Sequence, residues 1–312
     1  MDTPPIVENS TSPLGNEWQA QAQALPSTLP IYICALLPCL PIYFNPALSM
    51  PSSKPTLLLI HGSWHPKEVW ERVLPFLNAA GYNTITPQVC FCGTEKPVAS
   101  ILPCITQVQG IIAQETSAGR NVVVVNHSFG GVVGCSAVKG YTATDQSNIT
   151  PGAAGRVIGI VQTCAFTIPS NTGMREFVVK GGGMTPIAVA GPDGWDVFIR
   201  DPASALYQDL DPDDAKQWVG RLMKHSCHTR DTREGVYSGW KDVPLWYILC
   251  TDDQTVPPAF QEMMIEMVRK ENPTGATVRD LKSGHSPMLS MPKETADIFV
   301  AAAEACSTHH SL

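Results

Sequence analysis

Short apolar runs alternate with segments of helical periodicity along the chain from Thr56 onward. Leu57–His61 is an almost continuous apolar run of strand length, as expected of a strand buried on both faces. Lys67–Ala80 carries apolar residues three and four positions apart and ends at Gly81, which is typical of a helix and its C-cap. Further strands are predicted at 83–86, 121–126, 156–163, 244–251 and 276–281, and further helices at 105–118, 130–139, 258–270 and 293–305. This alternation predicts an α/β fold, a doubly wound, mostly parallel sheet with helices on both faces.

The region between the predicted strands at 156–163 and 244–251 holds about eighty residues without a strand pattern. It contains a run of three glycines and a helix-like stretch near 202–225. In a doubly wound sheet, an insertion of this size is most simply a cap over the crevice at the strand ends, where ligands bind. We therefore predict a cap at about 166–242, inserted after the strand near residue 160.

Residues 1–54 differ in composition from the rest of the chain. Ten of the 27 prolines fall within residues 1–55, and repeated proline interrupts both helices and strand pairing. We expect a poorly structured extension at 1–54, a folded domain at 55–306 and a short tail at 307–312. Met50 is an alternative start, because the chain would then open directly into the first strand.

The apolar run Ile31–Phe44 is the segment that raises the question of a membrane. It is fourteen residues long and is interrupted by Pro38 and Pro41, whereas a spanning helix needs about 20 residues. The basic residues that precede the apolar stretch of a secretory signal are absent from residues 1–30. We predict no membrane span and leave a membrane-peripheral role for this run open.

Composition excludes several classes of function. Charged residues make up 16% of the chain and give a net charge of −7, without basic blocks, so the chain lacks the electrostatic footprint of a nucleic-acid-binding protein. The ten cysteines are scattered and form no Cys-x-x-Cys pair, which argues against structural zinc and favours reduced thiols in a cytoplasmic protein. The partner that remains is a small molecule, and a homodimer is left open.

The segment Asn126–Gly131 (Asn-His-Ser-Phe-Gly-Gly) carries the sharpest chemical signal. It follows a run of four valines and precedes a predicted helix, which is the context of the Gly-x-Ser-x-Gly nucleophile turn, with Asn126 in the first glycine position. Asn tolerates unusual backbone angles better than most residues. The alternative, an ordinary serine or a phosphate loop at a glycine-rich helix start, is disfavoured because Gly-x-x-x-x-Gly-Lys-[Ser/Thr] is absent and no basic residue is near. Ser128 is therefore the candidate nucleophile.

A serine hydroxyl needs a base to take its proton, and that base needs an acid to orient it. In the chain order typical of this motif, the acid and then the histidine follow the serine. Asp252 and Asp253 come just past one predicted strand, and His285 follows the next. The carboxyl ends of parallel strands meet at one edge of a sheet, so these side chains can meet Ser128 there. The residues alone leave both aspartates open as the acid.

Three motifs resemble those of α/β-hydrolases of the small esterase type, the family of plant methyl-ester esterases and hydroxynitrile lyases and of similar microbial hydrolases. They are His61–Trp64, the Ser128 motif, and the paired Cys-Thr-Asp-Asp…Pro and Gly-His segments. The resemblance spans about residues 55–306 and implies a single α/β-hydrolase domain. In the family the acid lies four residues before a proline, which selects Asp253, before Pro257, as the third member of the triad.

The resemblance also implies how the rest of the site is built. Backbone N–H groups of Ser63 and Phe129 would form the oxyanion hole, because the family uses the residue after His-Gly and the residue after the nucleophile. Trp64 and His65 would line the acyl side of the pocket. Cys250 departs from the pattern, since family members commonly have glycine there.

The expected function is that of a serine-dependent carboxylic ester hydrolase, which cleaves an ester or lactone of a small, apolar molecule through an acyl-enzyme. Ser128, Asp253 and His285 form the expected triad, and no metal or organic cofactor is implied. One alternative is a hydroxynitrile-lyase-like reaction on the same triad, but the resembling lyases have lysine where Ser286 stands. A non-catalytic small-molecule receptor and a lactone-forming or lactone-opening enzyme of secondary metabolism also remain open.

Overall fold

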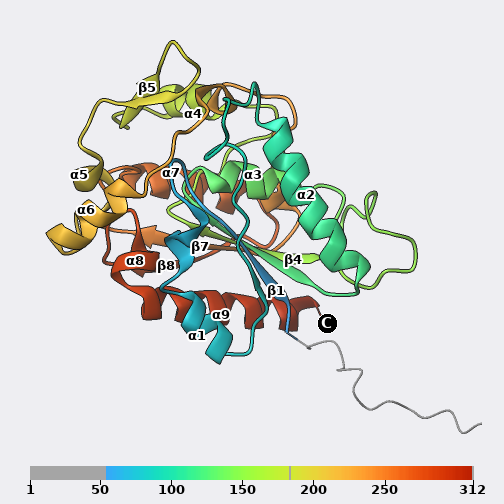
Figure 1. Ribbon diagram of the computed structural model, residues 1–312. Helices are drawn as coiled ribbons and strands as arrows, with labels where there is room; N and C mark the ends of the chain where they lie inside the picture. The colour runs from blue at the N-terminus through green and yellow to red at the C-terminus, as the bar shows by residue number, and fades with distance from the viewer. Residues whose placement is uncertain (1–53, 183, 311–312) are drawn as a thin grey trace, which may run out of the picture. The chain divides into compact units, whose positions relative to one another are not determined.

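The computed structural model describes residues 54–182 and 184–310, which form a six-stranded sheet covered by helices and a separate two-stranded sheet (Figure 1). The strands of the larger sheet lie in the order β2-β1-β3-β4-β7-β8, and every neighbouring pair is parallel. The bounds of the strands are β1 (Thr56–Ile60), β2 (Thr84–Ile85), β3 (Val122–His127), β4 (Val157–Thr163), β7 (Leu245–Cys250) and β8 (Ala276–Leu281). The predicted fold class is confirmed.

Alternate residues of β1 point to two separate hydrophobic cores, one on each face of the sheet. Leu58 and Ile60 pack in the core formed with α2, α3 and α7, whereas Leu57 and Leu59 pack in the core formed with α1 and α9. Figure 1 shows the two groups of helices on opposite sides of the strands. The bounds of these helices are α1 (Leu74–Ala79), α2 (Leu102–Ser117), α3 (Gly130–Ala137), α7 (Pro258–Glu271) and α9 (Pro292–His310).

The helix predicted at 67–80 is instead two elements, a 3-10 helix η1 (Lys67–Trp70) and the short helix α1. Pro75 explains the break, because proline has no N–H to donate to the carbonyl of Glu71 and its ring collides with that carbonyl in a continuous helix. Proline is accepted in the first turn of a helix, and α1 begins one residue before Pro75. The one-turn helix α8 (Pro287–Ser290), which begins two residues after His285, was not predicted.

The segment between β4 and β7 contains short helices and one short hairpin. The prediction that this segment contains no strands is wrong, since β5 (Ala188–Ala190) and β6 (Asp196–Phe198) pair antiparallel. Strands of three residues are too short to give a readable alternation. The remaining elements of this segment are α4 (Met174–Gly181), α5 (Pro202–Leu206), α6 (Pro212–Gly220), η2 (Cys227–Arg230) and η3 (Gly239–Lys241).

Two predictions concern the chain ends. The expected extension at 1–54 lies outside the described residues apart from Lys54. The expected tail at 307–312 is corrected in part, because α9 continues to His310. In the described part of the chain, no helix combines the length and apolarity needed to span a membrane.

Candidate active site

Ser128 lies on the sharp turn that joins β3 to α3. Its φ of 52° is in the left-handed region, which residues with a side chain rarely adopt. A Cβ atom on Gly130 would come within 2.5 Å of the carbonyl oxygen of His61, and one on Gly131 would come within 2.5 Å of that of Phe166. Both positions therefore require glycine, because the obstacle in each case is backbone. This is the strand–turn–helix geometry expected around Ser128.

A continuous chain of hydrogen bonds joins Ser128, His285 and Asp253. His285 Nε2 lies 3.0 Å from Ser128 Oγ, and His285 Nδ1 lies 2.8 Å from Asp253 Oδ2. The three residues are 5%, 1% and 3% exposed, in the same order as above. Because the Asp253 carboxylate accepts a hydrogen bond from the Nδ1–H group, the neutral ring has its lone pair at Nε2, facing the serine hydroxyl. The side chains come from the carboxyl ends of β3, β8 and β7, as the sequence predicts.

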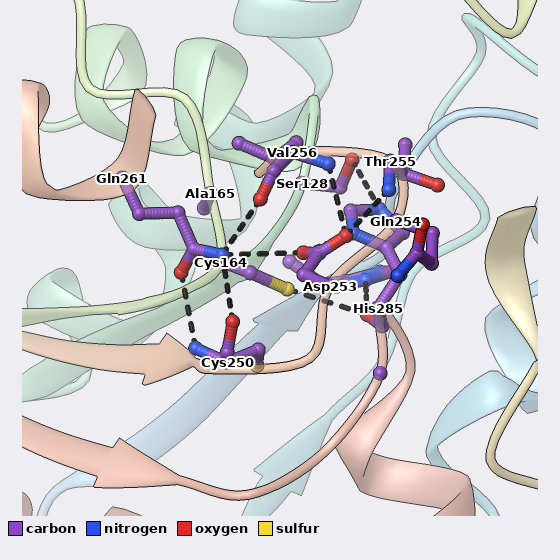
Figure 2. A network of polar contacts seen from close by, with 12 residues as sticks. Ser128, Cys164, Ala165, Cys250, Asp253, Gln254, Thr255, Val256, Gln261 and His285 are labelled. Carbon is purple, nitrogen blue, oxygen red and sulfur yellow. Dashed lines mark hydrogen bonds and ion pairs between the residues drawn. The ribbon is translucent and has the colours of Figure 1, made fainter. Parts of the chain in front are cut away.

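Asp253 and Asp252 have different surroundings although they are adjacent in the chain. Asp253 Oδ1 accepts hydrogen bonds from the backbone N–H groups of Thr255 (2.7 Å) and Val256 (2.9 Å), which fix the carboxylate (Figure 2). Asp252 is exposed, and among the described residues its backbone is bonded rather than its side chain, with its N–H 3.1 Å from the carbonyl oxygen of Ser283. Asp253 is therefore the aspartate that reaches His285.

Gln261 of α7 is a member of this network that the sequence analysis missed. Its Nε2 donates to Asp253 Oδ2 (3.3 Å) and to the carbonyl oxygens of Val256 (2.8 Å) and Cys250 (3.2 Å) (Figure 2). Its Oε1 accepts from the N–H of Cys250 at 3.1 Å. Cys250 thus takes part through its backbone, so a side chain at this position does not prevent the network from forming.

Cys164, His127 and His285 bring three atoms of metal-ligand type within 4.8 Å of one another. The Cys164 thiol and His127 Nε2 both donate to the carbonyl oxygen of His285, at 3.3 Å and 2.8 Å. Burial raises the pKa of Cys164, which favours the thiol over a metal-binding thiolate. These contacts hold the main chain at His285. Both ring nitrogens of His285 are already bonded, one to Asp253 and the other to Ser128.

Burial keeps His61 and His65, in the segment that follows β1, in the neutral form. It lowers the pKa of His61 to about 4 and that of His65 to about 3. The neutral form is needed for hydrogen bonding, because His61 Nε2 accepts a hydrogen bond from the Val89 N–H at 3.0 Å and only an unprotonated nitrogen can accept. His65 Nε2 lies 2.9 Å from the Tyr207 hydroxyl, whose pKa burial raises, so Tyr207 is the donor in that pair.

The two predicted oxyanion donors are backbone N–H groups that have no other partner among the residues the structure describes. Ser63 N–H and Phe129 N–H donate to no atom of the described residues. Ser63 is 4% exposed, and its carbonyl accepts from His65 Nδ1 at 2.8 Å, which fixes the orientation of the peptide. The ring of Phe129 is turned into the core, with its centroid 5.2 Å from that of Phe91. Only the backbone of Phe129 is therefore available to a ligand.

A cavity of about 200 Å³ opens at Ser128 and Ser63. Most of its lining comes from the segment between β4 and β7, and that lining is mainly apolar. The apolar residues of this segment at the cavity include Phe166, Met174, Val178, Val179, Ile187 and Ala188. The volume is below the roughly 300–1,000 Å³ of drug-sized pockets, so the cavity suits a small apolar group.

Trp64 and His65, the two residues expected to line the pocket, differ in position. Trp64 lines the cavity, and its contact with the acyl part of a substrate stays a prediction. The expectation for His65 is corrected, because His65 is not among the described residues that line it. Both ring nitrogens of His65 are engaged, one by the Ser63 carbonyl and the other by Tyr207, so it supports the Ser63 peptide from behind.

Comparison with known proteins places this geometry in a family. The family model described as "Alpha/beta hydrolase family" matches residues 57–298. The alpha/beta hydrolase nvfD of Aspergillus novofumigatus is 25% identical over 246 residues, which cover 77% of this chain and 92% of that protein. Methylesterase 1 of Arabidopsis thaliana is 23% identical over 271 residues, which cover 82% and 99%.

A solved structure has the same fold at lower sequence identity. The pyrethroid hydrolase from Sphingobium faniae superposes with a TM-score of 0.62 at 19% identity, and the match covers 80% of this chain and 98% of that one. At this identity the likeness shows the fold.

Proposed function

The chain belongs to the alpha/beta hydrolase family, and on that premise we propose that it is a serine-dependent carboxylic ester hydrolase with Ser128 as its nucleophile. The observation that carries the proposal is the buried chain of hydrogen bonds from Ser128 through His285 to Asp253. The names of its relatives, which include a methylesterase, support ester chemistry. The small apolar cavity supports an ester or lactone of a small, apolar molecule as the substrate.

The geometry supports a two-step acyl transfer. His285 Nε2 takes the proton of the Ser128 hydroxyl while Oγ attacks the ester carbonyl, and the same nitrogen then gives that proton to the departing alcohol. Water, deprotonated by His285, attacks the acyl-enzyme in the second step and releases the acid and the free serine. Asp253 keeps the proton at His285 Nδ1 throughout and stabilises the imidazolium that forms in each step.

The proposed oxyanion donors complete the arrangement. Negative charge develops on the carbonyl oxygen during each attack, and the N–H groups of Ser63 and Phe129 are the donors that we assign to it. Such donors act in a site from which water is excluded, and loss of one costs about 3–4 kcal/mol of barrier in a serine hydrolase. The apolar lining of the cavity provides that environment here.

Replacement of the nucleophile tests the proposal. Ser128→Ala should fold normally, lose labelling by a fluorophosphonate and lose several orders of magnitude in kcat on a p-nitrophenyl ester. Ser63→Ala should retain most activity, because Ser63 is assigned a role through its backbone N–H. An equal loss from both variants would contradict the assignment, as would full activity of Ser128→Ala together with reversible loss on metal chelation.

The same experiment separates the alternatives. A receptor would bind small molecules without ester turnover or stoichiometric labelling. A hydroxynitrile-lyase-like enzyme would release cyanide from a cyanohydrin, and Ser286 in place of the lysine of such lyases argues against that reaction. A panel of short-chain, aryl-methyl and lactone substrates then distinguishes ester from lactone hydrolysis.

A further inference from the structure

The charged side chains that line the cavity are all positive among the described residues. Arg175 and Arg230 are the charged side chains at the cavity, and no carboxylate is among the described residues that line it. The rest of the lining is apolar or carries a hydroxyl group. Burying a guanidinium group in an apolar wall costs free energy unless its N–H groups have acceptors. The hydrogen bonds of each arginine therefore show whether the protein supplies those acceptors or leaves N–H groups for a ligand.

Arg175 is satisfied by the protein. Its Nε and Nη2 both bond to the carboxylate of Asp231, and its side chain is 41% exposed. This is a bidentate pair at the edge of the cavity, with water available to its remaining hydrogens.

Arg230 is buried and only partly satisfied. Its side chain is 8% exposed, and of its three guanidinium nitrogens Nη2 alone has a hydrogen-bond partner among the described residues, the carboxylate of Asp196. Nε is fully buried and has no hydrogen-bond partner in the part of the chain that the structure describes. A guanidinium has five N–H donors, so most of the hydrogen-bonding capacity of Arg230 remains unused by the described protein atoms.

The position of Arg230 is fixed by its neighbours. It ends η2, and the strand that carries Asp196 is tied to that region by the hydrogen bond from the Asp196 N–H to the His225 carbonyl at 2.9 Å. The guanidinium lies 6.0 Å from the ring centroid of Trp64. Trp64 directly follows Ser63, the proposed oxyanion donor, so the guanidinium and the reacting carbonyl would lie at the same cavity.

We propose that Arg230 binds a second oxygen acceptor of the substrate, a ketone, lactone or carboxylate oxygen on the otherwise apolar part that occupies the cavity. This inference rests on the proposed ester hydrolysis and adds the class of substrate. A buried donor set of this kind rejects an analogue without the oxygen, because the donors would then be desolvated and left unpaired. The preferred substrate is therefore an oxo-ester, a half-ester of a diacid or a dilactone-like molecule, and a plain hydrocarbon ester is a poor one.

Asp196 limits how strongly a carboxylate is favoured over a ketone. Burial raises the pKa of Asp196 to about 6, although the charge of Arg230 opposes the shift. Its negative charge is thus present near neutral pH and partly compensates Arg230. Both oxygen types remain within the proposal, and the experiment distinguishes them.

The test compares kcat/KM for matched substrates. The set consists of the methyl ester of a linear acid, the same ester with a ketone at each successive chain position, and the half-ester of the matching diacid. The wild-type protein should prefer at least one oxygen-bearing member about tenfold or more over the plain ester. Preference for the half-ester would identify an ionic contact, and preference for a ketone a neutral one.

Substitution then assigns the preference to Arg230. Arg230→Met should reduce the preference to about one while the plain ester is still hydrolysed. Asp196→Asn keeps the guanidinium and should keep the preference, with a gain for the half-ester. Arg221→Met, which removes an arginine that is paired with Glu71 outside the cavity, is the matched control and should leave the preference unchanged.

Two results would overturn the inference: a wild-type protein that hydrolyses all members equally, or an Arg230→Met variant that keeps the preference. Should Arg230→Met fail to fold, the double variant Asp196→Leu/Arg230→Met removes both buried partners and is used instead. Fluorophosphonate labelling at Ser128 is measured in every variant. A wild-type protein that is not labelled would count against the proposed hydrolase. A wild-type protein that is labelled but does not discriminate among the matched substrates would count against the role of Arg230 alone.

Discussion

The side chain of Asn126 packs directly against the backbone of Gly134, so that a Cβ atom on Gly134 would overlap Asn126 Oδ1. Asn126 occupies the position where the Gly-x-Ser-x-Gly turn has its first glycine. The chain accommodates the larger side chain by having glycine opposite it, in the middle of α3. Asn126 has no left-handed φ, so the explanation from backbone tolerance is wrong, and Ser128 is the residue of the turn with that conformation.

This relationship predicts a compensating pair of substitutions. Gly134→Ala should lower the free energy of unfolding by about 1–3 kcal/mol through overpacking, although alanine is the better helix former by about 1 kcal/mol. Adding Asn126→Gly should restore stability, because it removes the clash and two buried amide atoms that have no hydrogen-bond partner in the described residues. Urea unfolding of both single variants and the double variant measures the coupling. Additive effects would contradict the proposed contact.

The two adjacent aspartates should respond differently to the same substitution. Asp253→Asn replaces the acceptor at His285 Nδ1 with a side chain that can favour the wrong tautomer, and kcat should fall by about four orders of magnitude. Asp252→Asn should stay within a fewfold of wild type, because its carboxylate is exposed. Steady-state kinetics on one ester decide the matter. An inactive Asp252 variant beside an active Asp253 variant would show that the acid is misassigned.

Gln261 should act as a positioning residue for Asp253. Gln261→Met removes the donor to Asp253 Oδ2, the bond to the Val256 carbonyl and the two bonds to Cys250, and it does not alter the cavity lining. We expect kcat to fall by about tenfold with little change in KM, since the reacting geometry is loosened while substrate contacts remain. Gln208→Met, which removes an exposed glutamine bonded to the Asp252 carbonyl, is the control. A rise in KM alone would indicate a role in substrate binding instead.

The sequence was most informative where local rules dictate the geometry. A run of four valines followed by Ser-Phe-Gly-Gly permits few structures, and the loops after parallel strands must gather at one edge of the sheet. Those two constraints were enough to predict that Ser128, His285 and one of two adjacent aspartates are neighbours, and the family resemblance then selected Asp253 by its spacing to Pro257. They act through backbone geometry, which short patterns encode.

The remainder of the site depends on tertiary contacts that no local pattern carries. Gln261 is one of several polar residues on α7, and its distinction is that the helix packs beside the Asp253 loop. Arg230 belongs to a segment whose strands have three residues each and give no periodicity. His65 follows the oxyanion segment in sequence, yet its ring turns away from the cavity toward Tyr207. Each of these positions is set by what packs against it from distant parts of the chain.

Stability should fall steeply as the pH drops below about 6.5. An unfolded histidine has a pKa near 6.5, and burial lowers the folded pKa of His61 to about 4 and of His65 to about 3. Between those values the unfolded chain binds protons that the folded chain does not, so acid favours unfolding by about 1.4 kcal/mol per pH unit for each histidine. Asp196 acts in the opposite direction below about pH 6, because its folded pKa is raised. The histidines outnumber it, and the net effect is acid destabilisation.

Urea unfolding at successive pH values from 7 to about 4.5 measures this dependence, and His61→Gln isolates one contribution to it. Glutamine cannot titrate, so the free energy of unfolding of the variant should depend less steeply on pH, by about 1.4 kcal/mol per unit. The variant should also be less stable than wild type at neutral pH. The slope rather than the absolute stability is the readout, because any substitution at a buried site lowers stability. If wild type and His61→Gln show the same slope, His61 is not held neutral in the folded protein, and its hydrogen bond from the Val89 N–H cannot have the assigned donor and acceptor.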